Sequence, residues 1–123
     1  MPPKTILLIE PDEAERQELA AVLEKAGYQV DQAANSVDGL RSFTDRRHDL
    51  VVVEVLLSGM NGLQVCKIVK DQGEQWSVKV IVVSKIYRSR AMAHDALSRY
   101  RADAYFSRPF PLVQLIEKIG ELI

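Results

Sequence analysis

Five short apolar segments alternate with longer segments in which apolar residues recur every three or four positions. This alternation predicts a parallel sheet with helices on both faces. The predicted strands are 5–9, 29–33, 50–55, 79–83 and 104–106. The first, third and fourth are almost wholly apolar, as expected of central strands, whereas the second and fifth are mixed and are predicted to form the edges. The pattern therefore predicts a doubly wound α/β fold with a five-stranded parallel sheet.

The helical segments carry recognisable start and stop signals. Asp12, Ser36 and Asn61 each precede a periodic apolar segment and can accept a hydrogen bond from its first turn. Gly27 and Gly73 stand where the first and third helices are predicted to end. The predicted apolar faces of the first three helices and the last are Leu19, Val22, Leu23 and Ala26; Val37, Leu40 and Phe43; Leu63, Cys66 and Val69; and Leu112, Leu115, Ile116 and Ile119.

Length and composition fit one globular domain over residues 1–123, since 47% of the residues are hydrophobic and no linker or repeat interrupts the pattern. A net charge of −1 gives no global electrostatic argument for binding nucleic acid or an anionic membrane. No apolar run approaches the roughly 20 residues that span a bilayer, and no signal peptide is recognisable. We therefore expect a cytoplasmic protein without membrane insertion.

Four residues with distinctive side chains are given structural roles. Cys66 falls on the apolar side of a predicted helix and is expected to pack as a small hydrophobic group. His48 and His94 lack companions with metal-ligand spacing, so we expect surface residues and no metal site. Trp76 is expected to cover the end of the third helix, with an exposed anchor for a partner as the alternative.

Polar residues follow the predicted strands, at the edge of the sheet where functional groups gather in parallel α/β proteins. They are Glu10, Pro11 and Asp12 after the first strand, Glu54 at the end of the third, Ser84 after the fourth and Arg108 after the fifth. Carboxylates beside a hydroxyl and a cation suit a site for Mg²⁺ and a phosphoryl group. The alternative is that these residues form an ordinary solvated rim.

Four motifs resemble the receiver domain of bacterial two-component response regulators, and the match covers essentially the whole chain. They are residues 6–12, residues 49–54 with the Gly59-Met60-Asn61-Gly62 turn, Ser84, and residues 105–110. The resemblance implies a flavodoxin-like fold, a metal-binding acidic pair, a phosphoacceptor aspartate, a Ser or Thr, and a Lys-Pro. It also implies a cis peptide bond between Arg108 and Pro109.

The chain departs from that pattern at three positions. Glu54 stands at the phosphoacceptor position, and its extra methylene moves the carboxylate about 1.5 Å further from the backbone. Pro11 replaces the acidic residue that the family uses as a direct metal ligand, and proline offers no side-chain oxygen. Arg108 replaces the lysine, which exchanges a compact ammonium for a planar fork suited to carboxylates.

These departures suggest a pseudo-receiver, which works without aspartyl phosphorylation. We expect Glu54 to pair with Arg108, with Ser84 nearby; the alternative is a solvated, independent Glu54. The expected function is a protein-interaction module in bacterial signal transduction, with no enzyme activity and no cofactor. An alternative is a residual Mg²⁺ or phosphoryl site formed by Glu10, Asp12 and Glu54.

Two further features bear on partners. Ser84 and Tyr105 correspond to the family's switch pair, although both residue types also have ordinary packing roles. The fourth helical segment is rich in arginine, and Arg101 stands where the family often has a glycine that ends the helix. The expected interaction face comprises Arg88, Arg90, Arg99, Arg101 and Tyr105.

The expected partner is a protein or a fused effector domain. By resemblance, the face of the fourth helix, fifth strand and fifth helix could also form a homodimer. Binding of a nucleotide or nucleic acid by the arginine-rich segment is a further alternative, disfavoured because no binding motif accompanies the arginines.

Overall fold

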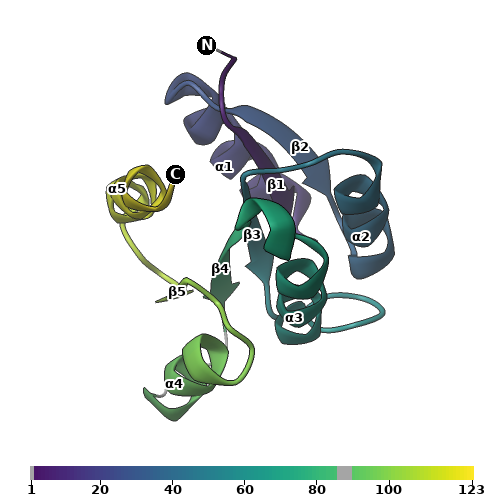
Figure 1. The fold of residues 1–123 in the computed structure, drawn as a ribbon. Helices are drawn as coiled ribbons and strands as arrows, with labels where there is room; N and C mark the ends of the chain where they lie inside the picture. Colours follow the sequence, from purple (N-terminus) through teal and green to yellow (C-terminus); the bar gives the residue numbers. More distant parts are fainter. Residues whose placement is uncertain (1, 86–89) are drawn as a thin grey trace.

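The computed structural model describes residues 2–85 and 90–123. Within them, one parallel sheet has the strand order β2-β1-β3-β4-β5 (Figure 1). The strands are β1 Thr5–Ile9, β2 Gln29–Ala33, β3 Leu50–Glu54, β4 Lys79–Ser84 and β5 Ala104–Ser107. The helices are α1 Glu13–Lys25, α2 Ser36–Asp45, α3 Gly62–Gln72, α4 Arg90–Ser98 and α5 Leu112–Leu122, with a 3₁₀ turn η1 at Glu74–Trp76. The predicted fold class and central strands are confirmed.

Helices cover both faces of this sheet. Helices α1 and α5 lie on one face, and α2, α3 and α4 lie on the other (Figure 1). Alternate residues of β1 and β3 enter the two cores; Leu8 and Val52 face the first group of helices, while Leu7 and Val51 face the second. Both central strands are therefore buried on each face, which explains why their sequences lack polar alternation.

The helix caps agree with the sequence at two of three positions. Asp12 Oδ1 accepts a hydrogen bond from Glu15 N at 2.9 Å, and Asn61 forms a full capping box with Gln64. The prediction that Ser36 caps α2 is wrong, because Asn35 Oδ1 accepts from Asp38 N at 2.8 Å. The helix therefore begins one residue earlier than predicted, at Ser36.

Ser36 instead fastens the loop that follows β3. Its hydroxyl donates to the Ser58 carbonyl and accepts from Met60 N, each at 2.9 Å. The shift in phase also corrects the prediction for Val37, which is 59% exposed rather than part of the apolar face. Close by, Gly62 brings α3 against the end of β3, where a Cβ would collide with the carbonyl of Glu54. Both contacts hold the loop that surrounds the carboxyl end of β3.

His48 corrects another prediction, because it is fully buried rather than a surface residue. Its Nε2 lies 2.7 Å from Asp31 Oδ2, and its ring stacks on Phe43 at 6.0 Å between centroids. Trp76 packs against the core here rather than standing as an exposed anchor, since its Nε1 donates to the His48 carbonyl at 2.8 Å and its ring packs on Phe43. Asp31 thus supplies the polar partner that makes a buried imidazole tolerable.

Cys66 is buried on α3, and burial raises the pKa of its thiol to about 12. Its Sγ donates to the Tyr100 carbonyl at 3.3 Å. The environment fits the predicted packing role, because a reactive thiol needs a lowered pKa.

Among the described residues, we find no helix that is both long and apolar enough to span a bilayer.

Arg101 occupies the turn between α4 and β5 in a left-handed conformation, with φ of 63°. Its guanidinium forms an ion pair with Asp71 of α3, in which both side chains are largely exposed. Exposed ion pairs contribute about 0–1 kcal/mol, whereas left-handed backbone costs a non-glycine residue roughly 1–2 kcal/mol.

This balance predicts that Arg101→Gly is more stable than Arg101→Ala by about 1 kcal/mol, the reverse of the order inside a helix. Both variants lose the ion pair, but only glycine relieves the backbone. Urea unfolding of the two variants measures the difference, and Asp71→Asn isolates the ion pair. An alanine variant as stable as the glycine variant would show that the left-handed turn carries no strain.

Candidate functional site

Glu10 stands at the carboxyl edge of the sheet with only 1% of its surface exposed. Its Oε1 accepts a hydrogen bond from Arg108 Nη2 at 3.0 Å, and its Oε2 accepts from the Asp12 backbone N–H at 3.0 Å. Arg16 Nη1 donates to the Glu10 carbonyl at 2.9 Å. Each carboxylate oxygen of this buried residue therefore already has a donor.

Glu54 ends β3 and is also 1% exposed. Its Oε2 accepts from the backbone N–H groups of Val55 at 2.7 Å and Leu56 at 3.4 Å, so the side chain folds back over its own loop. Its Oε1 lies 3.7 Å from Arg108 Nε, which is ion-pair range but too long for a hydrogen bond. The structure contradicts a solvated Glu54.

The expected pairing of Glu54 with Arg108 is present in this looser form, and the hydrogen bond goes to Glu10. The sequence did not predict this Arg108–Glu10 pair, although both residues stand directly after strands at one edge of the sheet. One guanidinium thus contacts two buried carboxylates. This buried cluster therefore contains two carboxylates and one guanidinium, that is, one more negative group than positive.

The electrostatics of Glu54 follow from this shortage of positive charge. Burial raises the pKa of the Glu54 carboxyl, and the neighbouring charge of Glu10 raises it further. The backbone N–H groups and Arg108 act in the opposite direction without cancelling the effect of burial. Glu54 therefore holds a proton more tightly in the folded protein than in the unfolded chain.

Arg108 is held by backbone as well as by charge. Its N–H donates to the Ser84 carbonyl at 2.8 Å, its guanidinium carbon lies 5.5 Å from the Phe110 ring centroid, and its side chain is 19% exposed. The bond between Arg108 and Pro109 is cis, as predicted. The hydrogen bond to the end of β4 therefore fixes the point, just after β5, from which the guanidinium reaches the carboxylates.

A second cation neighbours the same edge. Lys85 Nζ lies 2.6 Å from Glu15 Oε2, and hydrogen bonding with Glu15 raises the pKa of this lysine. Pro11 is exposed and Asp12 is engaged as the cap of α1. Within residues 2–85 and 90–123, no three His, Cys, Asp or Glu side chains gather in an arrangement that could hold a metal ion.

The two residues at the family's switch positions lie on neighbouring strands. Ser84 is fully buried at the end of β4, and Tyr105 on β5 is half-buried against the core beneath α2, α3 and α4. Ser84 is thus at the same edge as Glu54 and Arg108. Their assignment as a switch pair stays a prediction.

The arginines of the predicted interaction face do not form one cluster. Arg90 begins α4, whereas Arg99 and Arg101 follow its last turn, roughly 12 Å further along the helix axis. Arg101 is directed to Asp71 of α3. All three are exposed, and Arg88 lies outside the described residues.

Comparison with known proteins decides the family. The model of the response regulator receiver domain matches residues 6–120. The chain belongs to this family. Among curated proteins, the receiver domain is 30% identical over 121 residues to "Response regulator MprA" of Mycobacterium sp. (strain KMS), covering 98% of this chain and 51% of that protein. The chain thus spans about half the length of the curated relatives it matches.

Solved structures agree with this assignment. A CheY-like response regulator receiver domain protein from Methanospirillum hungatei JF-1 is 28% identical, covers 97% of this chain and 92% of its own, and gives a TM-score of 0.87. A Burkholderia pseudomallei response regulator, solved with a phosphorylated aspartic acid, calcium ion and citrate, is 26% identical with a TM-score of 0.83. It covers 94% of this chain and 65% of its own.

Removing the guanidinium should destabilise the receiver domain strongly. Arg108→Ala leaves the carboxylates of Glu10 and Glu54 buried without their cation, a change expected to cost about 3–5 kcal/mol of unfolding free energy. Arg108→Lys should cost less, since a single ammonium can bind one carboxylate but cannot reproduce the planar contact. Arg99→Ala, at an exposed arginine, is the matched control and should change stability by less than about 0.5 kcal/mol. Chemical denaturation compares them; equal effects at 108 and 99 would contradict the described pairing.

The raised pKa of Glu54 predicts a specific pH dependence. Because the folded state favours the protonated carboxyl, its contribution to stability is full below the ordinary pKa of 4.5 and is lost as the pH rises through the raised value. Glu54→Gln cannot ionise, so its unfolding free energy relative to the unsubstituted domain should grow as the pH rises from 4.5. Urea unfolding at a series of pH values gives this difference. A difference independent of pH would mean that the Glu54 pKa is not raised.

Proposed function

We propose that this receiver domain signals through protein contacts without being phosphorylated at the position of Glu54. The observation that supports this most is the Arg108 guanidinium, which lies between the buried carboxylates of Glu10 and Glu54. In this arrangement a permanent positive charge of the chain itself compensates one of the two buried carboxylates at this edge of the sheet. Other receivers change the charge at this edge by phosphorylation, whereas here the Arg108 side chain supplies a fixed charge.

A magnesium ion does not fit the residues present. Both oxygens of Glu10 accept hydrogen bonds, Asp12 caps α1, and Pro11 has no oxygen to donate. A cation placed near these carboxylates would also meet the charges of Arg108 and Lys85. We derive no reaction through a metal, and the alternative of a residual Mg²⁺ and phosphoryl site is the weaker one.

Glu54 is equally poorly placed as a phosphoryl acceptor. Its Oε2 is held by two backbone N–H groups over its own loop, and its Oε1 faces the guanidinium. In-line transfer needs a carboxylate oxygen directed at the donor. The Burkholderia pseudomallei response regulator was solved with a phosphorylated aspartic acid. This chain has the longer Glu54 at the position where its family resemblance places the phosphoacceptor.

The partner is proposed to be a protein or an effector domain fused to this one, since the curated relatives extend to about twice the length of this chain. The face of α4, β5 and α5 is the candidate contact surface, and Arg90 and Arg99, at the two ends of the α4 segment, are exposed. Separation of these arginines along α4 gives little support to nucleic-acid binding, which favours a continuous basic stripe.

The proposal predicts that the unsubstituted receiver domain gains no phosphoryl mass when incubated with a small phosphodonor and Mg²⁺. The combined variant Pro11→Asp, Glu54→Asp and Arg108→Lys should gain it, because the changes supply a metal ligand, shorten the acceptor and remove the guanidinium. Intact-mass spectrometry provides the measurement.

The single variant Glu54→Asp is the matched control. It should remain unmodified, or be modified far more slowly than the triple variant, because Arg108 and Pro11 still prevent metal binding. A stoichiometric adduct on the unsubstituted domain would overturn the proposal.

A further inference from the structure

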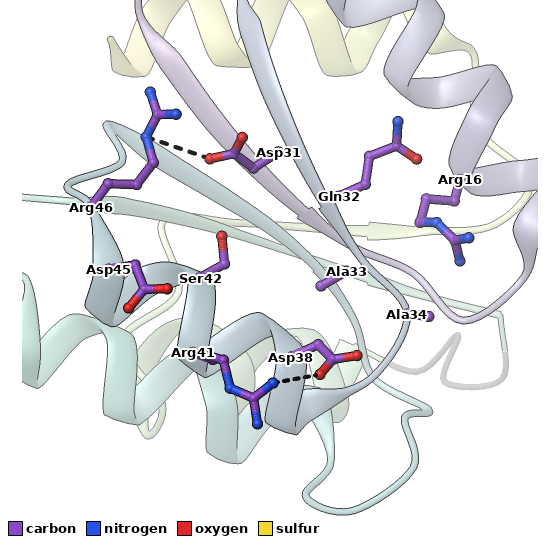
Figure 2. A pocket seen from close by; sticks show the side chains of 10 residues that line it. All are labelled: Arg16, Asp31, Gln32, Ala33, Ala34, Asp38, Arg41, Ser42, Asp45 and Arg46. Carbon is purple, nitrogen blue, oxygen red and sulfur yellow. Dashed lines mark ion pairs between the residues drawn. The ribbon is translucent and has the colours of Figure 1, made fainter.

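A broad hollow of the described surface lies away from the candidate site, along the edge strand β2. It encloses about 630 Å³ and opens between α1 and α2, with Asp31 and Gln32 of β2 beside Asp38, Arg41, Asp45 and Arg46 of the α2 segment. Figure 2 shows α2 and its charged side chains along one flank of β2, and Arg16 of α1 on the other. The outer edge of the sheet therefore lies within a groove that is open to a further strand.

The backbone of β2 directs hydrogen-bonding groups into this groove. Gln29 N donates to the Lys4 carbonyl and the Ala33 carbonyl accepts from Glu10 N, so the odd-numbered residues bond to β1. Because parallel strands alternate the direction of these groups, Val30 and Gln32 turn theirs to the open side, where β2 has no neighbouring strand.

Charge on the edge strand does not block pairing there. Proteins commonly protect such edges with a charged side chain. The charge available on β2 is Asp31, but its Oδ2 lies 2.7 Å from His48 Nε2 and 3.5 Å from Arg46 Nε. The carboxylate is thus turned to the α2 side and held there.

The charged residues of the α2 segment are complementary in sign to a second copy of the same segment that runs antiparallel to the first. Along the helix and its C-terminal cap residue their order is Asp38, Arg41, Asp45 and Arg46, which alternates negative and positive. Opposite an antiparallel copy, Asp38 meets Arg46 and Arg41 meets Asp45, so all four positions face the opposite sign. A parallel copy would place like charges together.

Strand β2 and helix α2 are placed so that one two-fold axis could relate both of them to a second copy. Ion pairing of Asp31 with Arg46 sets these residues at the same level, and Ala34 lines the hollow with Asp38 at the other end. The midpoint of the strand is near Gln32, level with the middle of the charge series. Since α2 packs on both β1 and β2, joining two β2 strands about 4.8 Å apart would set the two α2 axes about 10 Å apart, a normal helix-packing distance.

We propose that two copies of this receiver domain associate through antiparallel β2 strands, with Gln32 opposite Gln32 and the two α2 helices side by side. The contact joins two five-stranded sheets into one continuous sheet with two-fold symmetry. The inference does not depend on the proposed function, because none of its contacts involves Glu10, Glu54 or Arg108. A second copy is favoured over a peptide of one charge, since the groove carries both signs in a self-complementary order.

Charge reversal tests this contact by sedimentation velocity over a concentration series. The unsubstituted domain should show a monomer–dimer equilibrium. Either Arg41→Asp or Asp45→Arg should raise the dissociation constant at least roughly tenfold, since two-fold symmetry repeats the repulsion. The double exchange on one chain should restore the dimer, and so should an equimolar mixture of the two single variants. Restoration excludes misfolding as the cause of the loss.

A second pair of variants tests the strand. Gln32→Pro removes an N–H that faces the open side and leaves the bonds to β1 intact, so the monomer should fold but not dimerise. Gln32→Ala retains the N–H and should dimerise normally. Arg99→Asp, which reverses a charge near the other edge of the sheet, should have no effect.

Three results would overturn the proposal. The first is a domain that is monomeric at every concentration. The second is a dimer that dissociates with Arg99→Asp but survives both single reversals on α2, which would assign the contact to the face of α4, β5 and α5. The third is binding of an acidic or basic peptide along β2 with no self-association.

Discussion

The carboxyl edge of this sheet depends on one guanidinium. Arg108 donates to Glu10 and lies within ion-pair range of Glu54, and both carboxylates are almost completely buried. Burying two carboxylates next to each other is unfavourable unless a cation or a proton compensates. Arg108 compensates one charge, and the raised pKa of Glu54 shows that the balance remains incomplete.

The neighbouring structure keeps that cation in position. Arg108 N–H bonds to the end of β4, Gly62 allows α3 to approach the Glu54 carbonyl, and Ser36 fastens the loop after β3. The family's fold is thereby retained around an edge where Arg108 contacts both Glu10 and Glu54. The proposed phosphorylation-independent function rests on these fixed charges, because a bound metal and a phosphoryl group would allow the interaction state to change.

Much of the fold was predictable from sequence, because buried strands and capped helices leave local signals. The strands agree to within one residue, and Asp12 and Asn61 cap their helices as predicted. Contacts between distant residues were not predictable. Nothing local indicates that His48 is buried on Asp31, that Asn35 competes successfully with Ser36, or that Arg108 hydrogen bonds to Glu10 rather than Glu54. These outcomes depend on distances of a few ångströms between elements.

The central claim is that Arg108 occupies the acidic edge in place of a metal ion. NMR of the arginine Nε–Hε group observes this guanidinium directly, and Arg108→Lys identifies its signal. The account predicts a protected Arg108 signal at neutral pH that does not move when Mg²⁺ and beryllofluoride are added at millimolar concentration. A saturable shift of that signal, together with shifts in the amides of Glu10 and Glu54, would show that the edge still accepts metal and contradict the account.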